Sequence, residues 1–169
     1  ERYLKKNPDD PVARHQAAAI RGEQQDRVPE DYVREHFNAF AKSFDDALEA
    51  LEYRAPALVA EAVAEWRGET EKVPVAVDLG CGTGLCGPLM TDHCERLIGV
   101  DLSPAMLMKA ADAGGYHELH EEDLVRFLSA RPDEEFGLAI SADTLNYLGD
   151  LAPLMREMAR VLRRGAALV

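Results

Sequence analysis

The chain has few of the residues that hold small secreted domains or metal-bound domains together. Its 169 residues include three cysteines, Cys81, Cys86 and Cys94, an odd number without a C-x-x-C pair. A disulfide framework and a zinc knuckle are therefore not expected, and the thiols are interpreted as small buried groups in a reducing cytoplasm. A metal site at Cys86, His93 and Cys94 is disfavoured because the spacing fits no common zinc pattern.

Long apolar runs and an excess of basic residues are also missing. No stretch approaches the roughly 20 apolar residues of a membrane span, and no basic-plus-apolar signal opens the chain. The 31 acidic residues outnumber the 19 basic ones, which gives a formal charge of −12. That balance argues against nucleic acid or an anionic membrane as the main partner, since both bind basic surfaces. The unpaired cysteines and the missing signal lead us to expect a cytoplasmic protein. We also expect a fragment, because the chain begins at Glu1 and ends at Val169 inside an apolar run.

One glycine-rich stretch carries most of the functional signal. The apolar run at 73–79 ends in Gly80, Gly82 and Gly84, and apolar periodicity resumes over 85–93. This order predicts a strand, a tight turn and a helix. Glycine suits backbone that takes a positive φ or lies against a ligand, and the helix start would offer free N–H groups to an anionic group.

From residue 73 onward, strand signals alternate with helix signals. Further strands are predicted at 96–101, 116–120, 136–141 and from 166, with helices at 104–113, from 124 and at 151–163. Ser103 and Pro104 are a cap and a first helical residue, and Gly165 is predicted to end the last helix. The alternation predicts an α/β fold, with a doubly wound, parallel sheet covered by helices on both faces.

Residues 1–54 are predicted to form a helical extension. Asp10 would cap a short helix at 12–20, closed by Gly22. An apolar stripe at helical spacing follows, as one helix or as two with a bend capped by Ser43; its members are Val33, Phe37, Phe40, Phe44, Leu48 and Leu51. Its aromatic side chains allow two interpretations, plain packing or a lid over the glycine turn.

Another helix, at 56–66, would precede the first strand and stop at Gly68. Its expected inward face consists of Leu58, Val59, Ala62, Val63 and Trp66.

Acidic residues at the strand ends narrow the ligand class. Asp101 lies 21 residues beyond Gly80, where an acid can accept hydrogen bonds from both ribose hydroxyls. A dinucleotide site would need a third glycine at position 85, which is Leu85. Asp78 would repel a pyrophosphate but would suit an ammonium group. The pattern favours a nucleoside that carries an amino acid over a dinucleotide.

Taken in order, these motifs resemble those of class I S-adenosylmethionine-dependent methyltransferases. They are Val-Asp-Leu-Gly-Cys-Gly-Thr-Gly at 77–84, Ile-Gly-Val-Asp-Leu-Ser-Pro-Ala-Met-Leu at 98–107, Glu-Glu-Asp-Leu at 121–124, the segment 136–148, and Val-Leu-Arg-Arg-Gly at 161–165. Arg164 stands where proline is common in that family. The stretch 32–45 is similar to bacterial predicted methyltransferases that carry tetratricopeptide segments, and Asn7-Pro8-Asp9-Asp10 with the following helix resembles the joint of such a repeat.

The resemblance implies a Rossmann-like, mostly parallel sheet whose sixth and seventh strands would follow Val169. It implies an S-adenosylmethionine-binding domain at 55–169, preceded by the extension or lid at 1–54. The cofactor-binding candidates are Asp78, Gly80, Cys81, Gly82, Asp101, Leu102, Met106, Asp123, Leu124 and Ser141.

The resemblance also implies roles for these candidates. The glycines would admit the methionine part, and Asp78 would organise the turn or the ammonium end. Asp101 would hold the ribose. Leu102 and Met106 would flank the adenine, and Asp123 with the backbone of Leu124 would receive the adenine amine. Ser141 would lie near the sulfonium, whereas Cys81 is interpreted as a small filler of the turn. Asp123 is also a candidate helix cap.

The expected activity is methyl transfer to a small-molecule or protein acceptor, with S-adenosylhomocysteine as product. A base is needed only where the acceptor must lose a proton, and the candidates are Asp143, Tyr147 and His36. The Pro-Pro pattern of amino-group methyltransferases is absent after the fourth strand, which disfavours a DNA or protein amide acceptor. Two alternatives stay open: an NAD(P)-binding oxidoreductase, disfavoured by Leu85 and Asp78, and a non-catalytic adaptor that docks a partner through its N-terminal helices.

Overall fold

The computed structural model describes residues 3–10, 13–14, 17, 20–21, 28–68 and 71–169. Within these ranges the chain forms a five-stranded parallel sheet in the order β3-β2-β1-β4-β5. The strands are β1 (Val73–Leu79), β2 (Cys94–Asp101), β3 (Glu118–Glu121), β4 (Phe136–Ile140) and β5 (Leu162–Leu168). The predicted doubly wound α/β fold is confirmed.

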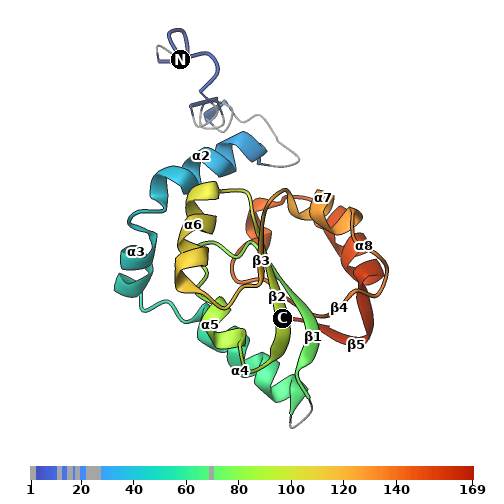
Figure 1. Cartoon of the computed structure of the whole chain (residues 1–169). Helices are drawn as coiled ribbons and strands as arrows, with labels where there is room; N and C mark the ends of the chain where they lie inside the picture. Colours follow the sequence, from blue (N-terminus) through green and yellow to red (C-terminus); the bar gives the residue numbers. More distant parts are fainter. Residues whose placement is uncertain (1–2, 11–12, 15–16, 18–19, 22–27, 69–70) are drawn as a thin grey trace.

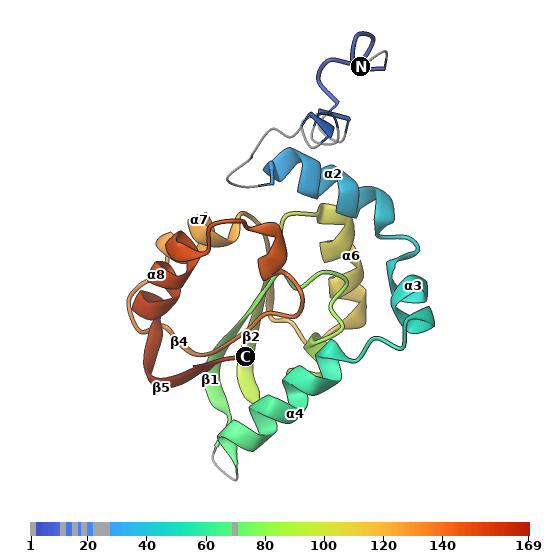
Figure 2. The ribbon, with the colours of Figure 1, turned by 180° about the vertical axis from the view of Figure 1, so that it is seen from behind.

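Helices cover both faces of this sheet (Figures 1 and 2). One face carries α4 (Ala55–Arg67), α5 (Gly87–Met90) and α6 (Pro104–Ala113), and the other carries α7 (Leu124–Ser129) and α8 (Ala152–Val161). Successive strand residues point to opposite faces, so Val77 and Leu79 pack with Phe127 under α7 and α8, whereas Ala76 packs with Val63 of α4. Burying each large apolar side chain contributes roughly 1.5–3 kcal/mol.

The N-terminal stripe forms two helices, α2 (Glu30–Phe40) and α3 (Phe44–Ala50), with a bend between them. Both lie beside α6 (Figures 1 and 2), and α2 contacts it. The prediction of Ser43 as a side-chain cap is wrong, because its Oγ donates to the Phe40 carbonyl at 3.5 Å instead of accepting a helix N–H. Leu51 is 75% exposed and does not belong to the stripe.

The helix predicted at 85–93 is wrong in length. Only Gly87–Met90 is helical, as α5, and Pro88 occupies its first turn. Thr91 Oγ1 donates to the Pro88 carbonyl at 2.9 Å, and the chain then turns directly into β2. One turn of helix sums too few peptide dipoles to form the anion site expected there.

The last helix also ends earlier than predicted. α8 stops at Val161, and Leu162 is already extended, with φ −80° and ψ 134°. Gly165, with φ +80°, lies inside β5 at a register shift against β4 and does not end a helix. Glycine in the left-handed region permits such a bulge.

The helix α4 buries fewer side chains than predicted. Val63 is fully buried and Val59 packs against the same core, but Leu58 is 52% and Trp66 42% exposed, and Ala62 is exposed as well. The contact with the sheet is therefore a narrow line of side chains along α4.

The short N-terminal helix is described only in part. Asp10 Oδ1 accepts the N–H of Ala13 at 2.8 Å, as expected of a cap. The remainder of the segment 12–20 and Gly22 lie largely outside the described residues, so the tetratricopeptide comparison stays a prediction. In the part of the chain that is described, no helix combines the length and apolarity that crossing a membrane requires.

Candidate cofactor site

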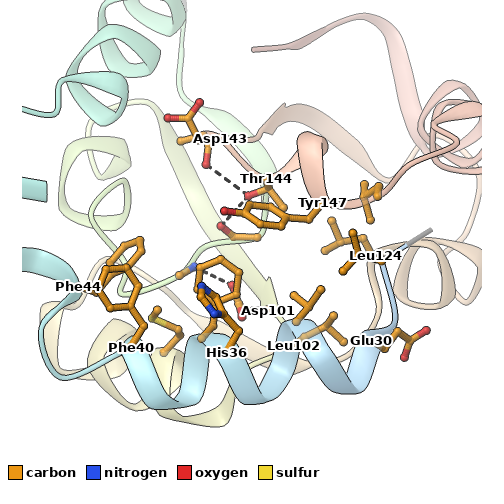
Figure 3. Close-up of a pocket in the computed structure, with 18 of the residues that line it drawn as sticks. Glu30, His36, Phe40, Phe44, Asp101, Leu102, Leu124, Asp143, Thr144 and Tyr147 are labelled. Atoms are coloured by element: carbon orange, nitrogen blue, oxygen red, sulfur yellow. Dashed lines mark hydrogen bonds between the residues drawn. The ribbon is translucent and has the colours of Figure 1, made fainter. Parts of the chain in front are cut away.

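A cavity of about 310 Å³ opens at the carboxyl ends of the strands. The strand order reverses around β1, between β2 and β4, and ligands of open α/β sheets bind at such a point. Figure 3 shows side chains from α2, α3 and the strand ends converging on it. The described lining residues include the acids Glu30, Asp101, Asp123 and Asp143 but no lysine or arginine. The cavity therefore suits a cationic ligand and disfavours a pyrophosphate.

The glycine turn shapes the floor of this cavity. Gly80 and Gly82 have φ values of +79° and +53°, a region that favours glycine. A Cβ at Gly80 would collide with the side chain of Thr144, whereas a Cβ at Gly82 would meet no atom within 4 Å. Since Gly82 lines the cavity, its missing side chain leaves room for a ligand.

Asp101 lies at the centre of the site. Its Oδ2 accepts the Gly82 N–H at 3.0 Å and its Oδ1 accepts the Ser103 N–H at 2.8 Å. Burial raises the pKa of Asp101, and the backbone N–H donors of Ser103, Gly82 and Leu102 partly counter that rise. A carboxylate has about four lone-pair sites, so both oxygens keep capacity for hydroxyl donors.

The two predicted adenine-flanking residues line the same cavity. Leu102 and Met106 are both part of its wall. Ser103, which lies between them in the sequence, caps α6 by accepting the Met106 N–H at 3.2 Å. The predicted cap and proline start of α6 are confirmed.

Asp123 and Leu124 line the cavity from the start of α7. The Asp123 carboxylate caps that helix by accepting the Arg126 N–H at 3.0 Å, and it is 2% exposed. The cap and the place in the cavity wall are therefore compatible. The contact with an adenine amine stays a prediction.

Asp78 lies beside the main cavity, in a side chamber of about 60 Å³ that shares Gly80 and Gly82 with it. The side chamber is lined by Phe44, Leu48, Tyr53, Pro56, Asp78, Gly80, Cys81, Gly82, Thr83, Leu85, Cys86 and Ala142. Asp78 is 1% exposed and accepts the hydroxyl of Tyr116 at 2.7 Å. Burial raises the pKa of Asp78 to about 7; the Tyr116 hydrogen bond lowers it and the charge of Asp101 raises it.

The positions of Cys81 and Ser141 indicate structural roles for both residues. Cys81 is buried, and burial raises the pKa of its thiol well above the usual value, which fits a small filler and not a nucleophile. Ser141 lines neither cavity, and its Oγ donates to the Leu79 carbonyl at 3.0 Å. All three cysteines are buried free thiols.

All three catalytic candidates line the cavity. Asp143 follows β4 with a φ of +54°, unusual for a residue other than glycine. It lies beside Tyr53, whose pKa is raised first by burial and then by the Asp143 carboxylate. Tyr147 and His36 line the cavity too (Figure 3). Asn146, which precedes Tyr147, is exposed and does not line it.

Sequence reasoning missed Tyr53, Thr144 and Tyr116. Thr144 Oγ1 donates to the Gly80 carbonyl at 3.2 Å and so braces the glycine turn. Tyr53 lies in the short link between α3 and α4, where no motif marks it. Tyr116 follows Gly114 and Gly115, and the sequence pattern places it in the third strand. Nothing local to any of these residues signals its partner.

The aromatic stripe of α2 and α3 forms a connected cluster over the cavity. Phe37 lies 5.2 Å from the Tyr147 ring and 6.3 Å from Phe44, and Phe40 lies 5.3 Å from Phe44, between ring centroids. These rings also line the cavity. Packing and cavity cover, the two interpretations of the stripe, therefore describe the same side chains.

Polar contacts fasten α2 and α3 to the motif loops. Asn38 Oδ1 accepts both the Ser103 hydroxyl at 2.7 Å and the Ala105 N–H at 3.2 Å. Asp45 accepts the Thr83 hydroxyl at 2.6 Å and pairs with Lys109 at 2.9 Å. The N-terminal helices thus contact the turn and the helix that frame Asp101.

Comparison with known proteins agrees with this arrangement. The family model described as "Methyltransferase domain" matches residues 77–169. The chain is 32% identical over 78 residues to an 18S rRNA (guanine-N(7))-methyltransferase of Bos taurus, which covers 46% of this chain and 27% of that protein.

Two solved structures are also similar. An S-adenosylmethionine-dependent methyltransferase of Mesorhizobium loti is 32% identical, with a TM-score of 0.50, over 60% of this chain and 47% of that one. A Haloferax volcanii complex between the Trm112 methyltransferase activator and a proposed methyltransferase has a TM-score of 0.62 at 24% identity, over 78% and 56% of the two chains. The latter shows the fold alone.

The chain spans about a quarter of the length of the bovine relative. The alternative of an NAD(P)-binding oxidoreductase finds no support in these comparisons. The match covers the glycine turn, Asp101, Asp123 and the segment after β4. The chain therefore belongs to the methyltransferase domain family, and S-adenosylmethionine is the cofactor that this membership implies.

Proposed function

We propose that this chain is the cofactor-binding part of a methyltransferase that acts on a small-molecule or protein acceptor. Residues 55–169 would form the S-adenosylmethionine-binding domain and residues 1–54 an extension whose helices act as a lid. The observation that supports this most is the cavity with acids but no described lysine or arginine, centred on Gly82 and Asp101 at the strand-order reversal. A sulfonium nucleoside is cationic, so this lining fits it.

Each part of the cavity has a proposed task. Asp101 would accept the ribose hydroxyls, Leu102 and Met106 would enclose the adenine, and the side chamber would take the amino-acid end, with Asp78 facing its ammonium group. S-adenosylmethionine supplies a methyl group that its sulfonium already activates. The chain's own contribution is then to position the reactants and to exclude water, which the aromatic rings of α2 and α3 are placed to do.

Proton removal from the acceptor is proposed for Asp143, which lines the cavity beside Tyr53. His36 and Tyr147 are the other candidates on the wall. The formal charge of −12 argues against a nucleic-acid acceptor, but the bovine relative is named as an rRNA methyltransferase. RNA is therefore included among the acceptors to be tested. A protein partner that docks through the N-terminal helices is also part of the proposal.

Turnover can be tested by release of S-adenosylhomocysteine from S-adenosylmethionine, with fractionated metabolite, protein and RNA extracts as acceptor sources. We expect one fraction to stimulate release, and Asp143→Asn to slow it by at least about 10-fold, as general-base removal does. Saturable cofactor binding without stimulation by any fraction would instead favour the non-catalytic adaptor.

The variant Gly82→Val is expected to abolish cofactor binding at a modest loss of stability. The new side chain would stand in the cavity, and the left-handed backbone costs about 1–3 kcal/mol of strain. Gly114→Val is the matched control, because Gly114 has a φ of +79°, a Cβ added there would meet no atom within 4 Å, and the residue lines neither cavity. Calorimetric titration with S-adenosylhomocysteine should fail for the first variant alone; equal binding by both would remove Gly82 from the site.

The variant Asp45→Ala is expected to loosen the lid. It removes the acceptor of Thr83 and Lys109, contacts worth about 1–2 kcal/mol together. Amide hydrogen exchange over residues 30–50 should then accelerate by about 5- to 10-fold, with the strands of the sheet unchanged. Asp46→Ala, at the neighbouring position, should leave exchange as it is, and the same result for Asp45→Ala would argue that the lid is held by the aromatic cluster alone.

A further inference from the structure

The ring of Tyr116 occupies a slot made by three glycines from different parts of the chain. A Cβ at Gly87, the first residue of α5, would collide with the ring, and one at Gly99, in β2, would lie 2.9 Å from it. A Cβ at Gly84, in the glycine turn, would lie 3.2 Å away. Side chains are therefore missing where the ring needs space, and the ring is fixed in one position.

The slot aims the Tyr116 hydroxyl at a buried carboxylate. It donates to Asp78 Oδ2 at 2.7 Å, and Asp78 is 1% exposed at the edge of the side chamber. Burial, and then the charge of Asp78, raise the pKa of Tyr116. The hydroxyl therefore stays protonated and remains a donor wherever the protein is folded. A donor to a carboxylate favours its charged form.

We propose that Tyr116 is a positioning residue that orients the Asp78 carboxylate and favours its ionised form, so that the side chamber can receive the ammonium group of the cofactor's amino-acid end. The inference rests on the proposed function, since it requires a nucleoside that carries an amino acid. It assigns to Tyr116, which lies outside the glycine turn, control over how Asp78 near the end of β1 binds the ammonium group.

The groups that face Asp78 leave this task to Tyr116. Asp101 from the end of β2 opposes ionisation by its charge, and burial of the thiols of Cys81 and Cys86 raises their pKa values, so they carry no charge. Tyr53, from the link between α3 and α4, interacts more strongly with Asp143 than with Asp78. No lysine or arginine is among the described residues that line the side chamber. A buried carboxylate needs a cationic partner, and a ligand with an ammonium group would bring one.

The test compares two ligands that differ in the amino-acid end. S-adenosylhomocysteine carries it and 5′-methylthioadenosine does not. Calorimetric titrations of wild type and Tyr116→Phe should show S-adenosylhomocysteine binding weakened by about 5-fold at neutral pH, because a rise of one unit in the pKa of Asp78 from about 7 lowers its ionised fraction from about one half to about one tenth. Binding of 5′-methylthioadenosine should change by less than about 2-fold, because its contacts lie with Asp101 and the adenine wall.

The pH profile separates this role from plain packing. Without the hydroxyl, the pKa of Asp78 rises further, so a larger fraction of the carboxylate is protonated at neutral pH. The ratio of the variant's to the wild-type dissociation constant should therefore shrink as pH rises from about 6.5 to about 8.5. Taking this ratio cancels the ionisation of the ligand itself.

Two further proteins complete the design. Tyr3→Phe removes another tyrosine hydroxyl that donates to an aspartate, the exposed pair with Asp10 at 2.9 Å, and should leave both ligands unaffected. In an Asp78→Asn background, Tyr116→Phe should cause no additional loss of S-adenosylhomocysteine binding. A loss shared equally by both ligands, a loss that persists in the Asp78→Asn background, or no loss at all would overturn the inference. Failure of wild type to bind either ligand would overturn the proposed function instead.

Discussion

Asp101→Ala is expected to weaken S-adenosylhomocysteine binding by about 100-fold or more, since each hydrogen bond to a charged group contributes about 1.5–3 kcal/mol. Two ribose hydroxyls would lose their acceptor. The N–H groups of Gly82 and Ser103 would lose theirs as well, so the glycine turn would be less well ordered for binding. Calorimetric titration, or competition dialysis where heats are small, measures the change.

The domain is expected to stay folded in this variant. Burial raises the pKa of Asp101, which means that the charged carboxylate is costly in the folded state and that its removal relieves this cost. Asp101→Asn serves as the isosteric companion. Asp112→Ala, at an exposed position on α6, is the control. An unchanged affinity in Asp101→Ala would show that the ribose contact is misassigned.

Asp78→Asn is expected to stabilise the ligand-free chain increasingly as pH rises. The pKa of Asp78 rises from 3.8 to about 7 on folding, so between these values the folded state binds more protons than the unfolded state. Stability of the wild type therefore falls as pH rises through this window, and the loss is complete above about pH 7. The asparagine variant lacks this dependence and should be more stable by about 4 kcal/mol at pH 8, since each pKa unit corresponds to about 1.4 kcal/mol, with no difference near pH 4.

Urea denaturation followed by circular dichroism, at matched pH values, gives this difference directly. The variant should lose S-adenosylhomocysteine affinity while it gains stability, as binding residues often trade the two. Asp112→Asn, exposed on α6, should show no pH-dependent gain. A gain in Asp78→Asn that is the same at acid and neutral pH would mean that Asp78 is already ionised in the folded chain.

Local patterns predict the fold where a single element carries its own stop signals. The bounds of β1 and α6 match the prediction, because a glycine follows the strand and Ser103, Pro104 and Gly114 mark the helix ends. The errors arise where glycine or proline has two meanings. Gly165 has the pattern of a helix stop but forms a bulge, and Pro88 sits in the first turn of a helix that ends within one turn.

The candidate site divides in the same way. Asp101, Gly82 and Asp123 could be found because strand ends in a parallel sheet converge on one edge. Contacts between distant segments could not be found in this way. Tyr116 reaches Asp78 across 38 positions and Thr144 reaches Gly80 across 64, and no periodicity relates such pairs.

The N-terminal stripe predicts the right helices but not their use. Spacing predicts an apolar face and says nothing of what that face covers. Here Phe37 and Phe44 line a cavity that the strand ends also line, and Asn38 and Asp45 make the polar contacts that fix the helices there. Those two polar side chains lie off the apolar face and would pass as ordinary surface residues in the sequence.

The central claim is that this cavity binds S-adenosylmethionine and its product. Calorimetric titration of the purified wild-type chain with S-adenosylhomocysteine, beside an identical titration with NADH, tests it most directly. We predict saturable binding of one S-adenosylhomocysteine per chain, displaced by S-adenosylmethionine, and no saturable heat with NADH. Saturable binding of NADH without binding of S-adenosylhomocysteine would contradict it.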